Sequence, residues 1–296
     1  MSEHEQTQAW QFGEVSITSV VEAQTDGIPP QFFFPDATGA KVAAHSWVVP
    51  TWADQDGNIG LRVQALVVRT PTRTIVVDPC VGNGKTLSLP FWNDQQYPFL
   101  QRFTAAGFDP ATVDLVVHTH LHEDHIGWDT QLVDGSWVPT FTRARHLYVR
   151  EALDAVRRLE RPDHAAVLAQ SIDPVFAVGL ADVIEMPADD GHDLGEGLRL
   201  ASTPGHTAGH VSVWIQPAGA DQAVLITGDC VHHPVQLAEP DWAETADIDV
   251  PLARDTRRRV FAEAASRGAV VFGTHFPTQS AGRIVPDGEV WRFVAL

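Results

Sequence analysis

The sequence contains few of the residues on which several classes of protein depend. Cysteine occurs twice in 296 residues, as Cys80 and Cys230, too few for a disulfide scaffold or a zinc framework of cysteine ligands. No stretch approaches the roughly 20 apolar residues of a membrane helix. The first fifteen residues lack the basic start and the apolar run of a signal peptide. We therefore expect a globular, cytoplasmic protein.

Positive charge is also scarce. The chain has 20 lysine and arginine residues against 38 aspartate and glutamate residues, which gives a formal net charge of −18. A surface this acidic repels phosphate backbones and anionic lipid headgroups, so nucleic acid and membranes are not expected partners. Hydrophobic residues make up 44% of the sequence, enough for a sizeable core. The partner that we expect is a small-molecule substrate.

Apolar patterning predicts a mixed α/β fold. Runs rich in valine and isoleucine predict strands at residues 14–21, 61–69, 74–78, 114–118, 198–202, 211–216, 223–227 and 269–272. Helical periodicity predicts helices at 98–106, 150–160 and 252–267. The last helix has an apolar face, followed by Gly268 as a stop; the face comprises Ala253, Val260, Phe261 and Ala264. Strands dominate both halves, which favours packed sheets with helices outside.

No composition boundary divides the chain. Residues 24–60 are loop-heavy, but no stretch has enough proline, glycine or serine for a linker. We expect a single domain over residues 1–296, with a loop-rich N-terminal extension of about residues 1–60.

The most informative motif follows the strand predicted to end near Val117. Four polar side chains lie within six positions of this motif: His120, His122, Asp124 and His125. The full sequence is Leu115-Val-Val-His-Thr-His-Leu-His-Glu-Asp-His-Ile-Gly127. Borderline metals such as Zn²⁺ favour imidazole and carboxylate ligands of this kind. A lone histidine would more often be a core or surface group, but this spacing predicts a metal site.

Three later fragments each end or follow a predicted strand with one further ligand type. They are Thr203-Pro-Gly-His206, Ile226-Thr-Gly-Asp229 and Phe272-Gly-Thr-His275. Each fragment alone is weak, because a Gly-Asp turn is usually only a turn. Their order and their placement at strand ends make coincidence a poor explanation.

With these motifs the chain resembles the metallo-β-lactamase superfamily, from about residue 61 to the C-terminus. The resemblance implies an αββα sandwich, in which two packed mixed sheets have helices outside and a two-metal site lies along one sheet edge. It implies that Asp78 supports the site without binding metal. The first metal would be held by His120, His122 and His206, and the second by Asp124, His125 and His275. Asp229 would bind both metals.

Details of the motifs resemble the methyl parathion hydrolase and quorum-quenching lactonase branch. These are the stretch 228–236 and the C-terminal segment 275–294. Zinc β-lactamases of the cysteine type have a cysteine at the position of Asp229, whereas Cys230 lies one residue later, so β-lactamase activity is not expected. The chain departs from relatives at Trp128, where a second glycine is common, and at Arg283, where the family has histidine.

The implied chemistry is hydrolysis of small esters or lactones, and organophosphate triesters are a further substrate class. Two metals can hold a hydroxide between them and lower its pKa towards neutrality, and this hydroxide would attack a carbonyl or phosphoryl centre. Asp124 would also accept or pass on the released proton. Two divalent ions are expected, with Zn²⁺ first and Mn²⁺, Co²⁺ or Fe²⁺ as alternatives. There is no Gly-x-Ser-x-Gly nucleophile elbow.

Four residues are candidates for contact with substrate: Phe33, Trp92, Trp128 and His232. His232 follows Asp229 by three residues and would donate a hydrogen bond to a developing oxyanion; the alternative is a loop histidine that faces solvent. Ordinary core packing is the alternative for each aromatic residue. The three phenylalanines at 32–34 cannot all face one side, so a loop over the site or a homodimer contact would cover some of them.

Other polar residues have supporting or structural interpretations. Thr119, Thr207 and His210 are candidates for orienting the ligands. His118, His146, His164 and His192 are expected to be structural or solvated, and Cys80 and Cys230 to be buried.

Three other functions remain open. A mononuclear iron sulfur dioxygenase shares much of the histidine pattern but needs one metal, whereas this chain retains ligands for two. An RNA-processing nuclease conflicts with the net charge of −18. A metal-binding domain without turnover does not explain a complete ligand set.

Overall fold

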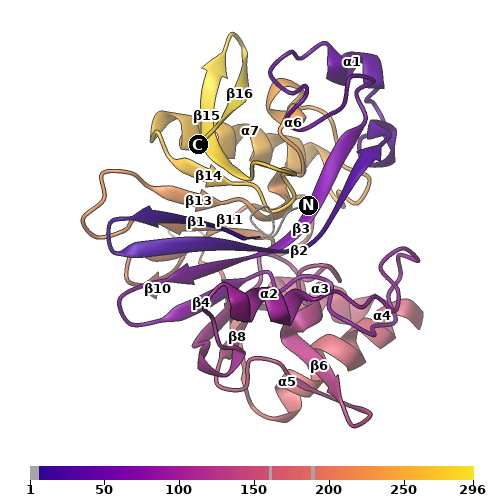
Figure 1. The fold of residues 1–296 in the computed structure, drawn as a ribbon, viewed down its shortest axis with the longest axis vertical. Coiled ribbons are helices and arrows are strands. Elements are labelled where there is room, and N and C mark those ends of the chain that lie inside the picture. The colour runs from indigo at the N-terminus through magenta and orange to yellow at the C-terminus, as the bar shows by residue number, and fades with distance from the viewer. Residues whose placement is uncertain (1–6, 160–161, 188–190) are drawn as a thin grey trace. The chain divides into compact units, whose positions relative to one another are not determined.

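The computed structural model describes residues 7–159, 162–187 and 191–296, and it contains two compact units. Unit 1 comprises residues 1–23 and 63–186, and unit 2 comprises residues 24–62 and 187–296. The described residues form two seven-stranded mixed sheets, as expected for an α/β fold, together with helices and a small two-stranded sheet (Figure 1). Whether the two units act as one domain stays a prediction.

The first sheet supplies the framework of unit 1. Its strands, in spatial order, are β1 (Thr7–Phe12), β2 (Val15–Ile28), β3 (Ile59–Arg69), β4 (Thr74–Val77), β5 (Leu115–Val117), β8 (Arg145–Val149) and β9 (Ala181–Ile184). Strands β4, β5, β8 and β9 are parallel neighbours. Parallel strands are covered on both faces, which explains the continuous apolar runs of β4 and β5.

Several helices and one hairpin complete unit 1. They are α2 (Phe99–Ala105), η3 (Pro110–Thr112), η4 (Gly127–Asp129), the hairpin β6 (Thr130–Val133) and β7 (Ser136–Pro139), α3 (Arg150–Arg158), α4 (Pro162–Val167), η5 (Leu168–Ile172) and α5 (Asp173–Ala177). Phe99 and Phe103 of α2 are fully buried, and their rings pack on Trp128 and Phe141. This aromatic core lies directly beside the segment that follows the histidine motif.

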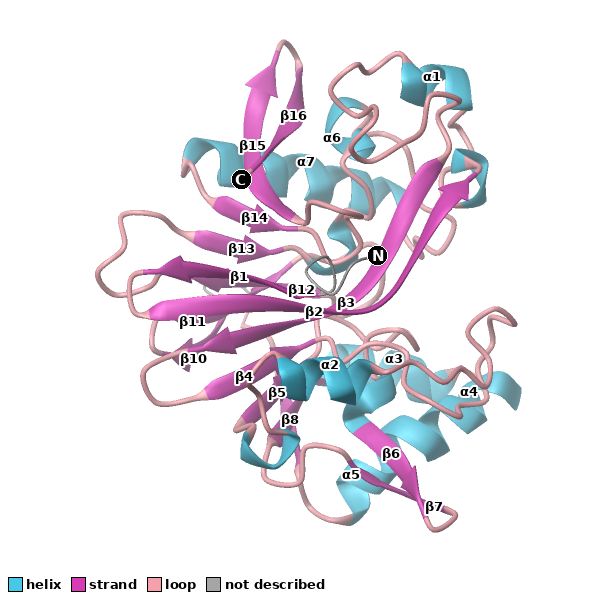
Figure 2. Cartoon of the chain, viewed as in Figure 1, coloured by secondary structure: helices cyan, strands magenta, loops and turns pink. Residues whose placement is uncertain are grey.

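The second sheet supplies the framework of unit 2. Its strands, in spatial order, are β10 (His192–Gly195), β11 (Leu198–Ser202), β12 (Val211–Ile215), β13 (Val224–Ile226), β14 (Val270–Phe272), β15 (Ala281–Asp287) and β16 (Val290–Ala295). Neighbours are antiparallel except for β13 and β14, which are parallel. The short helix η6 (Gly228–Cys230) follows β13. Figure 2 shows α6 (Val235–Ala238) and the long α7 (Val250–Ser266) among these strands.

Helix α7 confirms the prediction for this region and begins two residues earlier than expected. The Asp249 side chain accepts a hydrogen bond from the Leu252 amide, and Pro251 stands in the first turn, so both favour the earlier start. The whole predicted apolar face is buried. Gly268 has a φ of 57°, which ends the helix as predicted.

The loop-heavy segment 29–58 belongs to unit 2. It contains η2 (Pro30–Phe32) and α1 (Gly39–Ala43), and its remaining residues form turns. Trp52 is buried, its ring lies edge-on to Phe293 at 5.7 Å, and its indole donates to the Gln279 carbonyl at 3.1 Å. This segment therefore contributes to the core of unit 2, and the prediction of a loop-rich extension is not tested by these contacts.

The predicted strands and helices are present, with ends shifted by a few residues, although β2 runs seven residues beyond its predicted end. Residue 160, the predicted end of α3, lies outside the described residues. The elements without a prediction include β8 and β9, whose apolar runs are short, and the hairpin β15–β16. Among the described residues, no helix is long and apolar enough to cross a membrane.

Candidate functional site

Unit 1 contributes a loop that leaves the sheet where two parallel strands end. Strands β4 and β5 pair with Val77 opposite Val117, and the Asp78 amide donates to the Val117 carbonyl at 3.0 Å. Carboxyl ends of parallel strands meet at one sheet edge, so Asp78 lies beside the start of residues 119–126, the ligand loop. The loop carries four predicted ligands. His120, Asp124 and His125 are buried, and His122 is half-buried.

Asp78 determines which ring nitrogen carries the proton in two of these histidines. Its carboxylate accepts from the Thr119 amide at 2.7 Å and the Thr119 hydroxyl at 2.8 Å, and it lies 3.0 Å from Nδ1 of His125. Because the Thr119 hydroxyl donates to Asp78, its oxygen accepts from Nδ1–H of His120 at 3.1 Å. The neutral ring of His120 thus presents Nε2 as the atom that can bind a metal, and the close contact of Asp78 with Nδ1 favours the same arrangement in His125.

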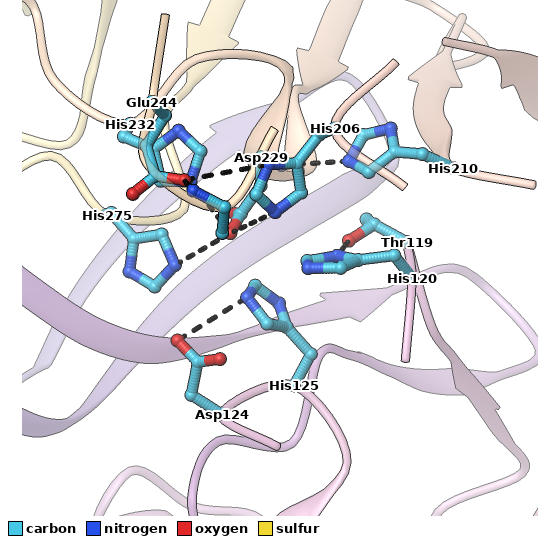
Figure 3. A network of polar contacts seen from close by, with 12 residues as sticks. Thr119, His120, Asp124, His125, His206, His210, Asp229, His232, Glu244 and His275 are labelled. Atoms are coloured by element: carbon cyan, nitrogen blue, oxygen red, sulfur yellow. Dashed lines mark hydrogen bonds and ion pairs between the residues drawn. The ribbon is translucent and has the colours of Figure 1, made fainter. Parts of the chain in front are cut away.

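Nε2 of His125 faces a second carboxylate. It lies 3.6 Å from Oδ2 of Asp124, and Figure 3 shows the two side chains turned towards each other. A ring nitrogen with a lone pair opposite a carboxylate oxygen is an arrangement that a cation between them stabilises. The residue types and their orientation in unit 1 therefore fit a divalent metal.

The turn at residues 78–82 closes tightly on the segment after the ligand loop. Asp78 and Cys80 both have positive φ, 54° and 48°, a conformation that residues other than glycine adopt only rarely. The amide of Gly127 donates to the Cys80 carbonyl at 2.6 Å. A Cβ on Gly127 would lie 1.7 Å from the Val81 carbonyl oxygen, so a larger residue does not fit there.

Glu22 is a buried partner of this turn that the sequence did not reveal. Its carboxylate accepts from the Val81 and Gly82 amides, at 2.8 and 3.1 Å, and from the Trp128 indole at 2.6 Å. Burial raises the pKa of Glu22 to about 7, although these three donors act in the opposite direction. Glu22 precedes a loop-rich segment without any catalytic pattern, so no local signal marked it.

Trp128 has the contacts of a structural residue. Its side chain is buried and stacks on Phe99 with ring centroids 5.4 Å apart, and its indole nitrogen is bound to Glu22. Contact between Trp128 and a substrate stays a prediction, and these contacts favour the packing alternative.

Unit 2 contributes three turns from one edge of its sheet. Ser202 of β11 pairs with Val211 of β12, so the turn that holds His206 connects these strands at that edge. Ile226 of the parallel strand β13 pairs with Phe272 of β14, so the segments that hold Asp229 and His275 both leave there. All three predicted ligands of unit 2 are buried.

Asp229 lies at the centre of these turns. Its Oδ2 is 3.2 Å from Nε2 of His275, 3.2 Å from Nε2 of His232 and 3.7 Å from Nε2 of His206. Figure 3 shows the three rings around the carboxylate. One carboxylate oxygen therefore faces three imidazole nitrogens within a single unit.

Two of these rings have their protons fixed on the far nitrogen. Nδ1 of His206 lies 3.0 Å from Oδ1 of Asp247, and Nδ1 of His275 lies 2.7 Å from the Arg62 carbonyl oxygen. Both partners only accept hydrogen bonds, so Nδ1 carries the proton and the neutral rings turn Nε2 lone pairs towards Asp229. Three imidazolium ions around one carboxylate would leave an excess of buried positive charge. A divalent cation fits the donor set better.

His232 is buried, so the alternative of a histidine that faces solvent is wrong. Its Nε2 is also 4.0 Å from the Glu244 carboxylate. Burial alone would lower the pKa of His232, but Asp229 and Glu244 outweigh burial and raise it to about 9.

His233 has a different role from its neighbour. Its Nε2 lies 2.9 Å from the Trp52 carbonyl oxygen, and its Nδ1 accepts from the Val235 amide at 3.1 Å. Burial lowers the pKa of His233 to about 4. The neutral ring ties the loop-heavy segment 29–58 to the start of α6.

His210 holds the backbone of Asp229 through a chain of hydrogen bonds whose directions are determined. Its Nε2 accepts from the Asp229 amide at 2.9 Å, so its Nδ1–H donates to the Thr203 hydroxyl at 2.8 Å. Thr203 then donates to Ser212 at 3.1 Å, because the Ser212 hydroxyl donates to the Thr227 carbonyl at 2.7 Å. Of the three expected orienting residues, Thr119 and His210 make such contacts, whereas the Thr207 hydroxyl has no hydrogen-bond partner among the described residues.

Asp247 is the second important residue that sequence reasoning missed. It accepts from His206 and from the Glu244 amide, and its Oδ2 lies 3.3 Å from the buried guanidinium of Arg257. Burial opposes ionisation, but the bond to His206 and the charge of Arg257 lower the pKa of Asp247 to about 2. It lies in an irregular loop with no motif around it, so no local pattern indicates its position.

The other candidate substrate residues lie in separate units. Phe33 is half-buried in unit 2, and its carbonyl accepts from the Thr245 amide at 2.9 Å. Trp92 is half-buried in unit 1 beside Phe91, with ring centroids 5.1 Å apart. Contact of either ring with substrate stays a prediction.

The remaining cysteines and histidines mostly have structural positions. Cys80 and Cys230 are buried, and burial raises the pKa of the Cys230 thiol to about 12. His118 and His146 are buried against Asp129, and His192 is half-buried at the start of β10. The side chain of His164 lies outside the described part of the chain.

Comparisons with known proteins agree with this geometry. The family profile described as the metallo-beta-lactamase superfamily matches residues 59–275. Among curated proteins, the probable metallo-hydrolase YflN of Bacillus subtilis (strain 168) is 31% identical over 122 residues, which cover 39% of this chain and 44% of YflN. The beta-lactamase-like protein 2 homolog of Caenorhabditis elegans is 27% identical over 123 residues, which cover 40% of this chain and 31% of that protein. The matches thus span less than half of either relative.

Solved structures share the fold over nearly the whole chain. AidC, a dizinc quorum-quenching lactonase in complex with a product, has a TM-score of 0.78 at 18% identity and covers 98% of this chain and 97% of its own. The hydrolase AbOPH has a TM-score of 0.77 at 24% identity, with the same coverage. The profile match over residues 59–275, with the two mixed sheets, leads to one conclusion: the chain belongs to the metallo-β-lactamase superfamily.

Proposed function

We propose that the protein is a metal-dependent hydrolase of small esters or lactones that uses two divalent ions. The observation that carries this proposal is the arrangement around Asp229, where two rings with Nδ1 protonated turn Nε2 towards one carboxylate oxygen. The superfamily's motif assigns His120, His122 and His206 to the first ion, Asp124, His125 and His275 to the second, and Asp229 to both. The proposal thus requires that the ligand loop of unit 1 and the turns of unit 2 bind the same pair of ions.

When bound, two such ions supply an activated water and polarise the substrate carbonyl. The chain itself supplies the groups that hold and move protons. Asp124 is 7% exposed and points towards His125, and in this proposal its carboxylate would accept a proton and pass it to the leaving group. His232 offers a ring N–H between Asp229 and Glu244, and this N–H would stabilise negative charge that develops on the substrate oxygen.

The substrate class rests on similarity. AidC is described as a lactonase and AbOPH as a hydrolase, and both share the fold of this chain. We therefore propose that the protein is lactonase-like, and we expect carboxylic esters and lactones as substrates before organophosphate triesters. The presence of ligands for a second ion supports a dinuclear hydrolase over the alternative, a mononuclear iron sulfur dioxygenase.

The test combines metal analysis with a substrate panel. Purified protein should contain close to two divalent ions per chain and should hydrolyse at least one of an acyl-homoserine lactone, an aryl ester or a paraoxon-type triester. Chelation should abolish hydrolysis, and Zn²⁺, Mn²⁺ or Co²⁺ should restore it to different degrees. One Fe²⁺ per chain with thiol oxidation, or hydrolysis by a verified metal-free sample, would overturn the proposal.

A further inference from the structure

Unit 1 contains a second buried polar cluster that takes no part in the proposed reaction. Its centre is Asp129, the last residue of η4, and it includes His118, His146 and Tyr148. His118 directly precedes the ligand loop, and Asp129 follows it by three residues. The cluster therefore touches both ends of the segment that carries His120, His122, Asp124 and His125.

Three polar side chains contact the Asp129 carboxylate. Its Oδ1 lies 2.9 Å from Nε2 of His118 and 3.1 Å from Nδ1 of His146, and its Oδ2 accepts from the Tyr148 hydroxyl at 2.8 Å. Nδ1 of His118 lies 3.0 Å from the Leu147 carbonyl oxygen. Asp129, His146 and Tyr148 are fully buried, and His118 is 3% exposed.

Two features of this cluster point to a role in the loop rather than in general packing. The His118–Asp129 contact joins residues eleven positions apart and so closes a short chain segment whose freedom would otherwise oppose metal binding. His146 and Tyr148 belong to β8, which pairs with β5, so the contact is also fixed to the sheet from which the loop departs. In a buried, low-dielectric setting such polar contacts are strong and directional.

We propose that the His118–Asp129 pair is a clasp that closes the base of the ligand loop and thereby positions its metal-binding side chains. His118 and Asp129 are positioning residues, because neither is among the proposed ligands. The inference rests on the proposed function for its consequence in metal binding, but the clasp itself can be tested without metal. The competing interpretation, a third metal site at Asp129, His118 and His146, is an outcome of the same test.

The first experiment compares Asp129→Asn with Tyr148→Phe. Asp129→Asn removes the negative charge and replaces one acceptor oxygen by an NH₂ donor, which weakens the contact with His118, whereas Tyr148→Phe removes one donor and leaves the His118–Asp129 contact intact. We expect Asp129→Asn to weaken Zn²⁺ affinity about tenfold, the scale on which outer partners of metal ligands act, and to change the visible spectrum of the Co²⁺-loaded protein. The Zn²⁺ affinity of Tyr148→Phe should stay within about twofold of the wild type, even where its Tm falls as much as that of Asp129→Asn. Equal losses of affinity in the two variants would reduce the cluster to ordinary packing and overturn the clasp.

The second experiment uses hydrogen exchange on the metal-free full-length chain. Amides of residues 119–128 should exchange faster in Asp129→Asn and in His118→Asn than in Tyr148→Phe, and unchanged protection in the first two variants would refute the clasp. This measurement stands even if the wild type proves to bind no metal, a result that would defeat the proposed function alone. A wild-type content of three ions that falls to two in Asp129→Asn would show a metal site instead of a clasp.

Discussion

The two units place their metal-binding side chains by different means. In unit 1 four predicted ligands lie on one loop. Asp78 accepts hydrogen bonds from Thr119 at its start, and Asp129, which follows the loop, contacts His118, which precedes it. In unit 2 the ligands come from three separate turns, and the register of β11 to β14 brings these turns to one sheet edge. The conformation of a contiguous ligand loop is restricted by side-chain contacts, whereas the positions of separate turns are determined by the strands that they connect.

The partners of the imidazoles differ in the same way. In unit 1 both fixed rings depend on Asp78, directly or through Thr119. In unit 2 each ring has its own acceptor, Asp247 for His206 and the Arg62 carbonyl for His275. Unit 2 instead shares a single central carboxylate, Asp229, and this difference can be tested.

The largest expected effect is the loss of that shared carboxylate. Asp229→Ala should lose the paired ions and most hydrolysis, a larger effect than the roughly 100-fold upper range for outer partners. Asp124→Ala, which removes a ligand assigned to one ion, should keep about one ion per chain. Metal analysis of both dialysed variants checks this, and equal metal contents would contradict the central role of Asp229.

The next effect concerns the stability of unit 2 in acid. His233 accepts the Val235 amide and has a pKa of about 4, below its ordinary value of 6.5, so between these pH values the unfolded chain binds the extra proton. The free energy of unfolding is therefore unaffected by the protonation of His233 above pH 6.5. It decreases by about 3 kcal/mol as the pH falls towards 4. Urea unfolding of the wild type and of His233→Gln at several pH values measures this. An acid dependence as steep in the variant as in the wild type would show that His233 is not its source.

His232 separates catalysis from metal binding within the same cluster. His232→Ala should retain both ions and lower kcat about 100-fold, because a donor to the developing oxyanion is lost. Kinetics with the lactone and ester panel, together with metal analysis, measure the two properties separately. An unchanged kcat/KM across the panel would leave His232 with a structural role.

The smallest effect tests the hydroxyl chain behind Asp229. Thr203→Val removes the acceptor for Nδ1–H of His210, and we expect a few-fold loss of Zn²⁺ affinity as the Asp229 backbone gains freedom. Thr256→Val is the matched control, because it removes a buried hydroxyl bond to the Pro204 carbonyl without contact to His210. Similar affinities for the two variants would argue against a special role for the chain.

Local sequence patterns predict much of the fold and of the ligand set. Apolar runs bordered by turn residues are sufficient to place β3, β4, β5 and α7, because burial and capping act over a few residues. The ligand loop shows its residue types at metal-binding spacing, and similarity to a known superfamily joins it to His206, Asp229 and His275. Short strands such as β8 and β9 carry too little pattern to be recognised alone.

Tertiary structure alone decided which distant groups hold these side chains in place. Glu22, Asp129 and Asp247 are ordinary carboxylates in the sequence, and no local pattern distinguishes them from the chain's other acidic residues. Each becomes a buried partner of the site because folding brings it to donors far along the chain: Glu22 to the turn at 78–82, Asp129 to β8, and Asp247 to His206. A buried carboxylate persists only where such donors offset its desolvation, and strand register and chain path, rather than residue type, determine where those donors lie.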